Sequence, residues 1–128
     1  MDATASAGWT ALRIVTWVLR LAVAALFLFA AFMKLSGQPM MIEEFGKIGM
    51  GDWFRSATGL IEVAGAILVL IPMTTAFGAL LLLCVDIGAF FAQAFILHGD
   101  VIHTLVIGVV LLVLLYLQRH QLLGRLGG

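Results

Sequence analysis

Four long apolar stretches follow one another along the chain, and short polar segments separate them. They cover about residues 12–35, 54–71, 77–97 and 101–117. A helix needs about 20 apolar residues, and at least about 17, to cross a bilayer, and a backbone in lipid must satisfy its own hydrogen bonds. The pattern predicts an all-α integral membrane protein, an antiparallel four-helix transmembrane bundle that forms one domain over residues 1–128.

The connection between the first two stretches, residues 36–53, is amphipathic. It contains Pro39 and mixes Met, Ile and Phe with glycines and charged residues. We expect a short helix on the membrane surface here, with its Met and Phe side chains turned toward the lipid. The other two connections, residues 72–75 and 98–100, are short enough to be tight turns.

Composition supports the bilayer as the solvent. Of the 128 residues, 63% are hydrophobic and 11% are charged, whereas soluble domains are about 45–50% apolar and about 25% charged. The formal net charge is zero and no basic run occurs, so nothing indicates a nucleic-acid partner. The single cysteine, Cys84, excludes an intrachain disulfide and a CxxC redox pair.

Four spans would place both termini on one side of the membrane. The excess of Arg and Lys on that side favours the cytoplasm for the termini, in the cell inner membrane. On the other side, acidic residues offset the basic ones. The arginines on the side of the termini are Arg13, Arg20, Arg119 and Arg125.

Three charged residues lie deep within the predicted spans. Arg20, Glu62 and Asp86 lie about 12–14 Å from the points where their spans begin, at a rise of about 1.5 Å per residue. The hydrocarbon layer is about 30 Å thick, so this depth is near its midplane. A charge there faces the protein interior and marks a functional site by default. We therefore expect Arg20 to form a salt bridge with Glu62 or Asp86, and Gln93 to share the face of Asp86.

Two interpretations of this polar set stay open. In the structural one, an ion pair only holds the helices in register. In the functional one, a buried cavity binds a polar or redox-active small molecule, or relays a proton. Two carboxylates near one site titrate as a coupled pair, and the proton they share is what a relay uses.

A metal site is the weaker interpretation of three residues near the last connection. His98, Asp100 and His103 are metal-ligating types, but the spacing of the two histidines places them on different faces of a continuous helix. We expect no metal ion here, and no haem, because the histidines lie at the ends of the spans.

Several short motifs resemble the DoxX family of small four-span membrane proteins, and the DoxX-like branch in particular. The resemblance covers about residues 19–93, although Ala30 and Ala31 stand where the family often has a glycine. It implies that Arg20, Lys34 and Glu62 are the family's characteristic positions, and that Arg55, Gly59 and Gly65 belong to its motifs or helix interfaces. The motifs are Leu-Arg-Leu at 19–21, Phe-Met-Lys-Leu at 32–35, Trp-Phe-Arg at 53–55, Gly-Leu-Ile-Glu-Val-Ala-Gly-Ala at 59–66 and Leu-Ile-Pro at 70–72.

The resemblance implies a role in membrane redox chemistry. The family is similar to subunits of quinone-linked oxidoreductases of sulfur metabolism, so the first hypothesis is a subunit of a redox-associated complex with a quinone near Arg20, Glu62 and Asp86. The chain has no motif for an electron carrier, so this role needs a redox-enzyme partner or a diffusible substrate. Whether the chain is itself an enzyme stays open.

Two further hypotheses stand beside it. Distant relatives look like assembly chaperones or cargo receptors, which would make the protein a non-enzymatic assembly factor whose charges fix helix packing. The third hypothesis is a small proton-coupled transporter, which four short helices could form only as a homo-oligomer.

Overall fold

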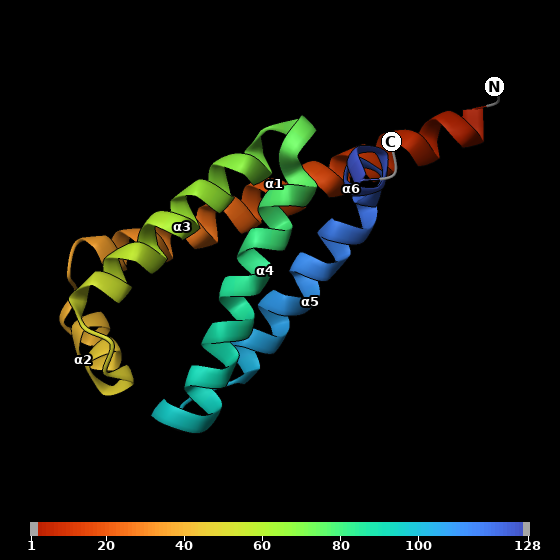
Figure 1. Ribbon diagram of the computed structural model, residues 1–128. Helices are drawn as coiled ribbons and strands as arrows, with labels where there is room; N and C mark the ends of the chain where they lie inside the picture. Colours follow the sequence, from red (N-terminus) through yellow and green to blue (C-terminus); the bar gives the residue numbers. More distant parts are fainter. Residues whose placement is uncertain (1–2, 127–128) are drawn as a thin grey trace.

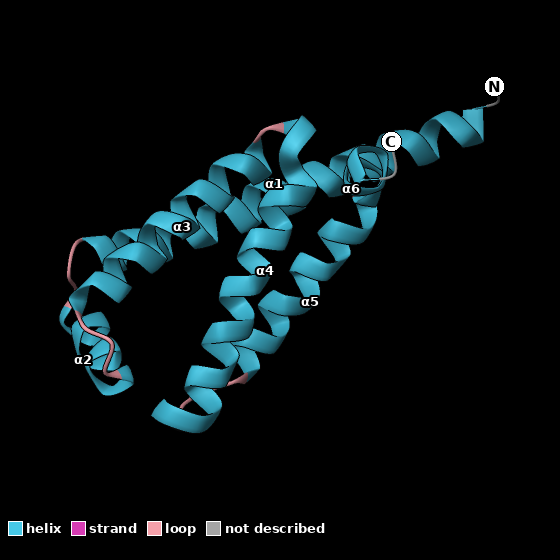
Figure 2. Ribbon diagram, in the orientation of Figure 1, coloured by secondary structure: helices cyan, strands magenta, loops and turns pink. Residues whose placement is uncertain are grey.

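The computed structural model describes the backbone of residues 3–126 and the side chains of residues 8 and 10–123, and every regular element in this part is a helix (Figures 1 and 2). The all-α prediction is therefore confirmed. The elements are α1 (Ala3–Leu35), α2 (Pro39–Ile48), α3 (Asp52–Leu70), the 3₁₀ turn η1 (Pro72–Thr74), α4 (Thr75–Phe91), the π-helical turn η2 (Ala92–Leu97), α5 (Ile102–Leu117) and α6 (Arg119–Leu126).

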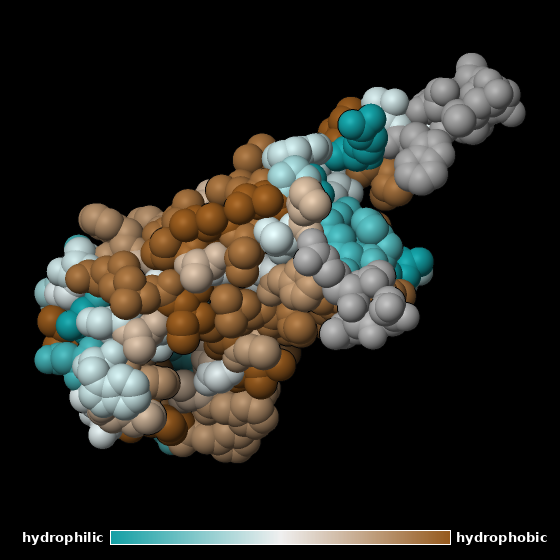
Figure 3. Space-filling view, turned by 45° about the horizontal axis from the view of Figure 1, so that its top comes forward, coloured by the Kyte–Doolittle hydropathy of each residue, from teal (hydrophilic) through white to brown (hydrophobic). Residues whose placement is uncertain are grey.

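Three helical segments of the described chain are long and apolar enough to cross a membrane. They are Thr10–Leu35, Asp52–Leu70 and Pro72–Leu97, and the apolar α5 is shorter, with 16 residues. Large apolar side chains cover the outside, such as Phe29 at 64% exposure and Ile102 at 67%. Figure 3 shows this hydrophobic surface along the helices, with hydrophilic residues gathered toward the two ends. Such a surface is suited to contact with lipid rather than water.

Small residues bring α3 and α4 close together after the tight turn. A Cβ on Gly78 would lie 2.6 Å from the Val69 backbone nitrogen and 2.7 Å from the Gly65 carbonyl oxygen. A Cβ on Gly65 would lie 2.5 Å from Leu82. The two helices therefore touch backbone to backbone, which is how membrane helices gain packing energy without a hydrophobic driving force.

The core joins α1, α3, α4 and α5 near the end where α6 lies. From this core the pair α1 and α3 separates from the pair α4 and α5, and α2 lies at the wide end (Figure 1). There α2 contacts both α3 and η2. The buried core residues are Val23, Ala24, Phe27, Ala66, Val69, Ala79, Leu82, Leu111 and Leu114.

The short helix expected between the first two spans is present as α2. The prediction that its Met and Phe side chains face the lipid is wrong in part. Phe45 is buried, and its ring centroid lies 5.7 Å from that of Phe54 on α3. Met41 and Ile48 also face the interior and line the cavity described below. The reason is that α2 packs on α3 and η2, so its apolar side is covered by protein rather than by lipid.

Candidate functional site

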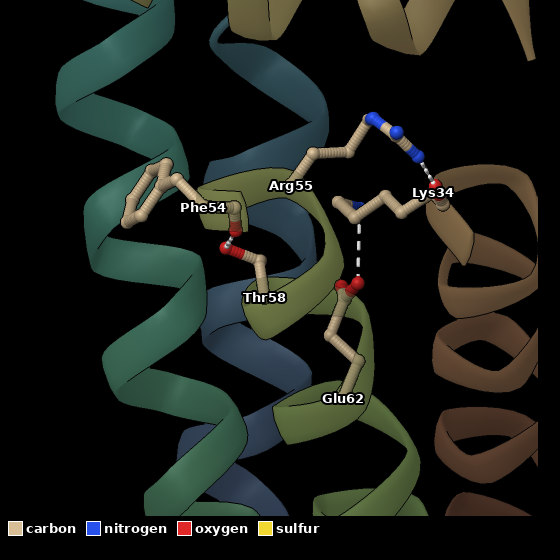
Figure 4. A network of polar contacts seen from close by, with 5 residues as sticks. All are labelled: Lys34, Phe54, Arg55, Thr58 and Glu62. Atoms are coloured by element: carbon tan, nitrogen blue, oxygen red, sulfur yellow. Dashed lines mark hydrogen bonds and ion pairs between the residues drawn. The ribbon is translucent and has the colours of Figure 1, made fainter. Parts of the chain in front are cut away.

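An ion pair joins the end of α1 to α3. The Lys34 Nζ atom lies 3.0 Å from Glu62 Oε1, and the two side chains are only 15% and 3% exposed. Figure 4 shows the lysine reaching across from the last turn of α1 to the carboxylate on α3. A buried pair of this kind balances two charges that would each be costly alone.

The surrounding motif residues hold this pair in place. Arg55 donates a hydrogen bond to the carbonyl oxygen of Lys34, and its Nη2 lies 3.9 Å from Asp52 Oδ1 (Figure 4). A Cβ on Gly59 would lie 2.9 Å from Leu35 and 3.3 Å from Lys34. The glycine thus allows α1 and α3 to approach, and the structure brings these motif residues together around Glu62.

The predicted salt bridge from Arg20 to Glu62 or Asp86 is wrong. Arg20 is buried, but its Nε donates to Thr75 Oγ1 at 3.0 Å and its Nη2 to Gln118 Oε1 at 3.3 Å. Its guanidinium also lies over the Trp17 ring, 4.7 Å from the centroid. Fourteen residues separate Arg20 from Lys34, about 21 Å along a helix. Arg20 therefore belongs to the end of the molecule where α4 begins and α5 ends.

Asp86 faces the interior, as predicted, and is 7% exposed. Among the described residues it has no hydrogen bond and no ion pair. Opposite Asp86, the helix α5 presents Gly108, and a Cβ on this glycine would lie 2.9 Å from Asp86 Oδ2. Any other residue at position 108 would therefore press on the carboxylate.

A cavity of about 610 Å³ lies between the two helix pairs, on the side of α2. Its size is within the range of about 300–1,000 Å³ that small-molecule sites occupy. Some of its wall is also outer surface, because Leu26 and Phe29 line it and are 44% and 64% exposed. Most of the lining is apolar or aromatic. The polar residues that line it are Lys34, Glu44, Thr58, Glu62, Asp86, Gln93, His103 and Thr104.

Gln93 joins this cavity from the π-helical turn η2. The carbonyl of Gln93 accepts a hydrogen bond from the Gly99 nitrogen at 3.0 Å, and a Cβ on Gly99 would lie 2.2 Å from Gln93 Oε1. Turns of π-helix are rare and occur frequently at functional sites. Three of the four predicted ligand or relay candidates, Glu62, Asp86 and Gln93, thus line one cavity.

Sequence reasoning missed Lys34 as the cation of the site, together with Glu44 and His103. Lys34 was named from the sequence only as a characteristic position of the family, not as the partner of Glu62. The available signal was the connection from Leu35 to Asp52, which reverses the chain and brings the end of α1 level with the first turns of α3. Glu44 and His103 carried no such signal, because their positions depend on how α2 and α5 pack.

The residues considered for a metal do not converge. His103 Nδ1 lies 3.9 Å from Asp100 Oδ2, and His98 has a left-handed backbone with a φ of 53°. Within residues 3–126, no group of three His, Cys, Asp or Glu side chains is arranged to hold a metal ion.

Comparison with protein families decides the family. The model of the DoxX-like family matches residues 18–117. The chain belongs to the DoxX-like family. Neither the curated proteins nor the solved structures give a significant match. All residues that line the cavity lie within the DoxX-like segment, so the cavity belongs to the part of the chain that defines the family.

Proposed function

We propose that this DoxX-like protein is a subunit of a redox-associated complex of the cell inner membrane, and that its cavity holds an amphipathic molecule of the quinone class. The observation that carries the proposal is a mostly apolar cavity of about 610 Å³ with Lys34, Glu62 and Asp86 in its wall. Apolar walls with a few placed polar groups are typical of small-molecule sites.

The proposal includes four spans. The 16 residues of α5 are about 24 Å long at the helical rise, close to what a span needs, and α4 packs along α5. This gives an antiparallel four-helix bundle with both termini in the cytoplasm. Arg13, Arg20 and Arg119 lie toward the α6 end, which fits the excess of basic residues on cytoplasmic segments.

The residues of the cavity suit a quinone in three ways. Phe27, Phe45 and Phe54 offer aromatic faces to a ring. Lys34 supplies N–H donors for a carbonyl oxygen, and Asp86 can accept or give a proton. A quinone bound here would supply the redox chemistry, while the protein binds and orients it. A redox-enzyme partner would deliver or remove the electrons.

A pair of cavity variants tests this proposal. The protein is purified in mild detergent, and its lipophilic content is extracted and identified. Ala30→Phe places a ring in the cavity, whereas Ala25→Phe makes the same change on the exposed side of α1. We expect a quinone in the wild type and in Ala25→Phe, and its loss in Ala30→Phe. No quinone in the wild-type protein would contradict the proposal.

The same purification separates the other two hypotheses. A membrane protein that co-purifies without a small molecule, and that disappears from the membrane on deletion of this chain, would favour the assembly factor. Proton-coupled uptake by liposomes that contain only this protein would favour the transporter, which requires a homo-oligomer.

A further inference from the structure

Three carboxylates line the cavity, and two of them, Glu62 and Asp86, are buried in different surroundings. Glu62 is paired with Lys34 at 3.0 Å. Asp86 is 7% exposed and, within the described part of the chain, has neither a hydrogen bond nor an ion pair. A buried polar group without a hydrogen-bond partner is unfavourable. Asp86 therefore has unused hydrogen-bonding capacity that faces the cavity.

The neighbours of Asp86 leave this capacity open. Thr104, a buried threonine of α5 that lines the same cavity, donates its hydroxyl hydrogen to the Val101 carbonyl at 2.6 Å. Gly108 packs close to Asp86 Oδ2 and offers it no side-chain donor, since a Cβ there would lie 2.9 Å from that oxygen. Asp86 itself lines the cavity, so an occupant of the cavity can approach the carboxylate.

The other charged and titratable groups around the cavity come from every element that surrounds it. Lys34 lies on α1, Glu44 on α2, Glu62 on α3 and His103 on α5, with the amide of Gln93 on η2. A cationic ligand would meet the Lys34 ammonium in the same cavity. A neutral hydroxyl satisfies the acceptor on Asp86 without adding a charge to an apolar space.

We propose that Asp86 accepts a hydrogen bond from a hydroxyl on the polar head of the ligand, so that the cavity selects a hydroxyl-bearing head over one with ether or carbonyl oxygens. This inference rests on the proposed function and specifies it. Of the two redox forms of a quinone, the cavity holds the hydroquinone more tightly. Asp86 is then the residue that distinguishes the product from the substrate of a quinone reduction.

Three ligands of one shape test the selection: decylhydroquinone, its dimethyl ether and decylbenzoquinone. Their binding to the purified protein is measured under argon at pH 7.5. Hydrogen bonds to charged groups contribute about 1.5–3 kcal/mol, which corresponds to roughly tenfold or more in affinity. We expect the hydroquinone to bind about tenfold more tightly than the other two.

Variants assign the selection to one carboxylate. Asp86→Leu removes the acceptor at similar volume and should bring the three affinities within about threefold of one another. Glu44→Gln changes another carboxylate that lines the cavity and should leave the order unchanged. If Asp86→Leu does not fold, the comparison of the three ligands on the wild-type protein still decides.

The outcomes separate the two proposals. Equal binding of the three ligands, or tighter binding of the quinone, would overturn the role of Asp86 and leave the quinone-class cavity standing. Loss of selection in Glu44→Gln would assign the hydroxyl to Glu44 instead and also overturn it. Failure of all three ligands to bind would overturn both proposals.

Discussion

Lys34, in the last turn of α1, and Glu62, near the middle of α3, form an ion pair of 3.0 Å in the wall of the cavity. The pair has a structural and a chemical consequence. It fixes two helices to each other through charge, and among the described residues it leaves Asp86, another buried carboxylate of the cavity, without an ion-pair partner. Experiments on this pair and its surroundings can separate helix packing from ligand binding.

The first prediction concerns the stability of the pair. Lys34→Met leaves Glu62 as an unpaired buried charge, and breaking a buried pair in this way is destabilising by about 3–5 kcal/mol. The double variant Lys34→Met with Glu62→Leu removes both charges and should recover most of the lost stability. Thermal unfolding in detergent of the wild type, the two single variants and the double variant measures the coupling. Additive effects of the two substitutions would show that the pair does not interact in the folded protein.

The second prediction separates function from folding at Glu62. Glu62→Gln keeps the size of the side chain and can still accept a hydrogen bond from Lys34, so the protein should fold. It loses the charge, so we expect loss of function and of bound ligand. The matched control is Arg20→Met, which lies outside the cavity and should keep its ligand while losing some stability at the α6 end. Full function in a folded Glu62→Gln protein would mean that the pair only holds the helices in register.

The third prediction compares two glycines of the same helix. On α4, a Cβ at Gly78 would lie 2.6 Å from the Val69 backbone, whereas a Cβ at Gly88 would have nothing within 4 Å. Gly78→Ala forces α3 and α4 apart and should destabilise the protein by about 1–3 kcal/mol. Gly88→Ala should be neutral or slightly stabilising, because alanine favours a helix by about 1 kcal/mol over glycine. Equal unfolding temperatures for the two variants would contradict the close packing of these helices.

The fourth prediction is the orientation in the membrane. In a Cys84→Ser background, a cysteine at Lys47 on α2 should react with a membrane-impermeant maleimide in intact cells. A cysteine at His120 on α6 should react only after permeabilisation. The reverse pattern would place the termini outside.

Much of the helical architecture could be predicted from the sequence, because runs of about 20 apolar residues have few alternatives in lipid. The inward direction of Glu62, Asp86 and Gln93 followed from the same physics, since an unpaired polar group is unfavourable against hydrocarbon. These predictions needed only the position of each residue within its own span.

Relations between spans were less accessible. The depth of Arg20 was counted from residue 12, where the apolar run begins, but α1 starts at Ala3 and its level depends on its neighbours. The α2 helix was expected to face lipid, because nothing in its sequence shows that Phe45 packs against Phe54. The π-helical turn that carries Gln93 does not follow the α-helical periodicity of 3.6 residues, so the sequence pattern does not predict it.

Leu26 and Phe29 belong both to the cavity wall and to the surface exposed toward the membrane. A ligand held at Asp86 therefore does not have to lie entirely inside the protein. Its head would lie among the polar side chains, and a long hydrocarbon tail would continue between the acyl chains of the surrounding lipids. Under this arrangement the protein distinguishes molecules by their heads, and homologous compounds that differ only in tail length bind alike.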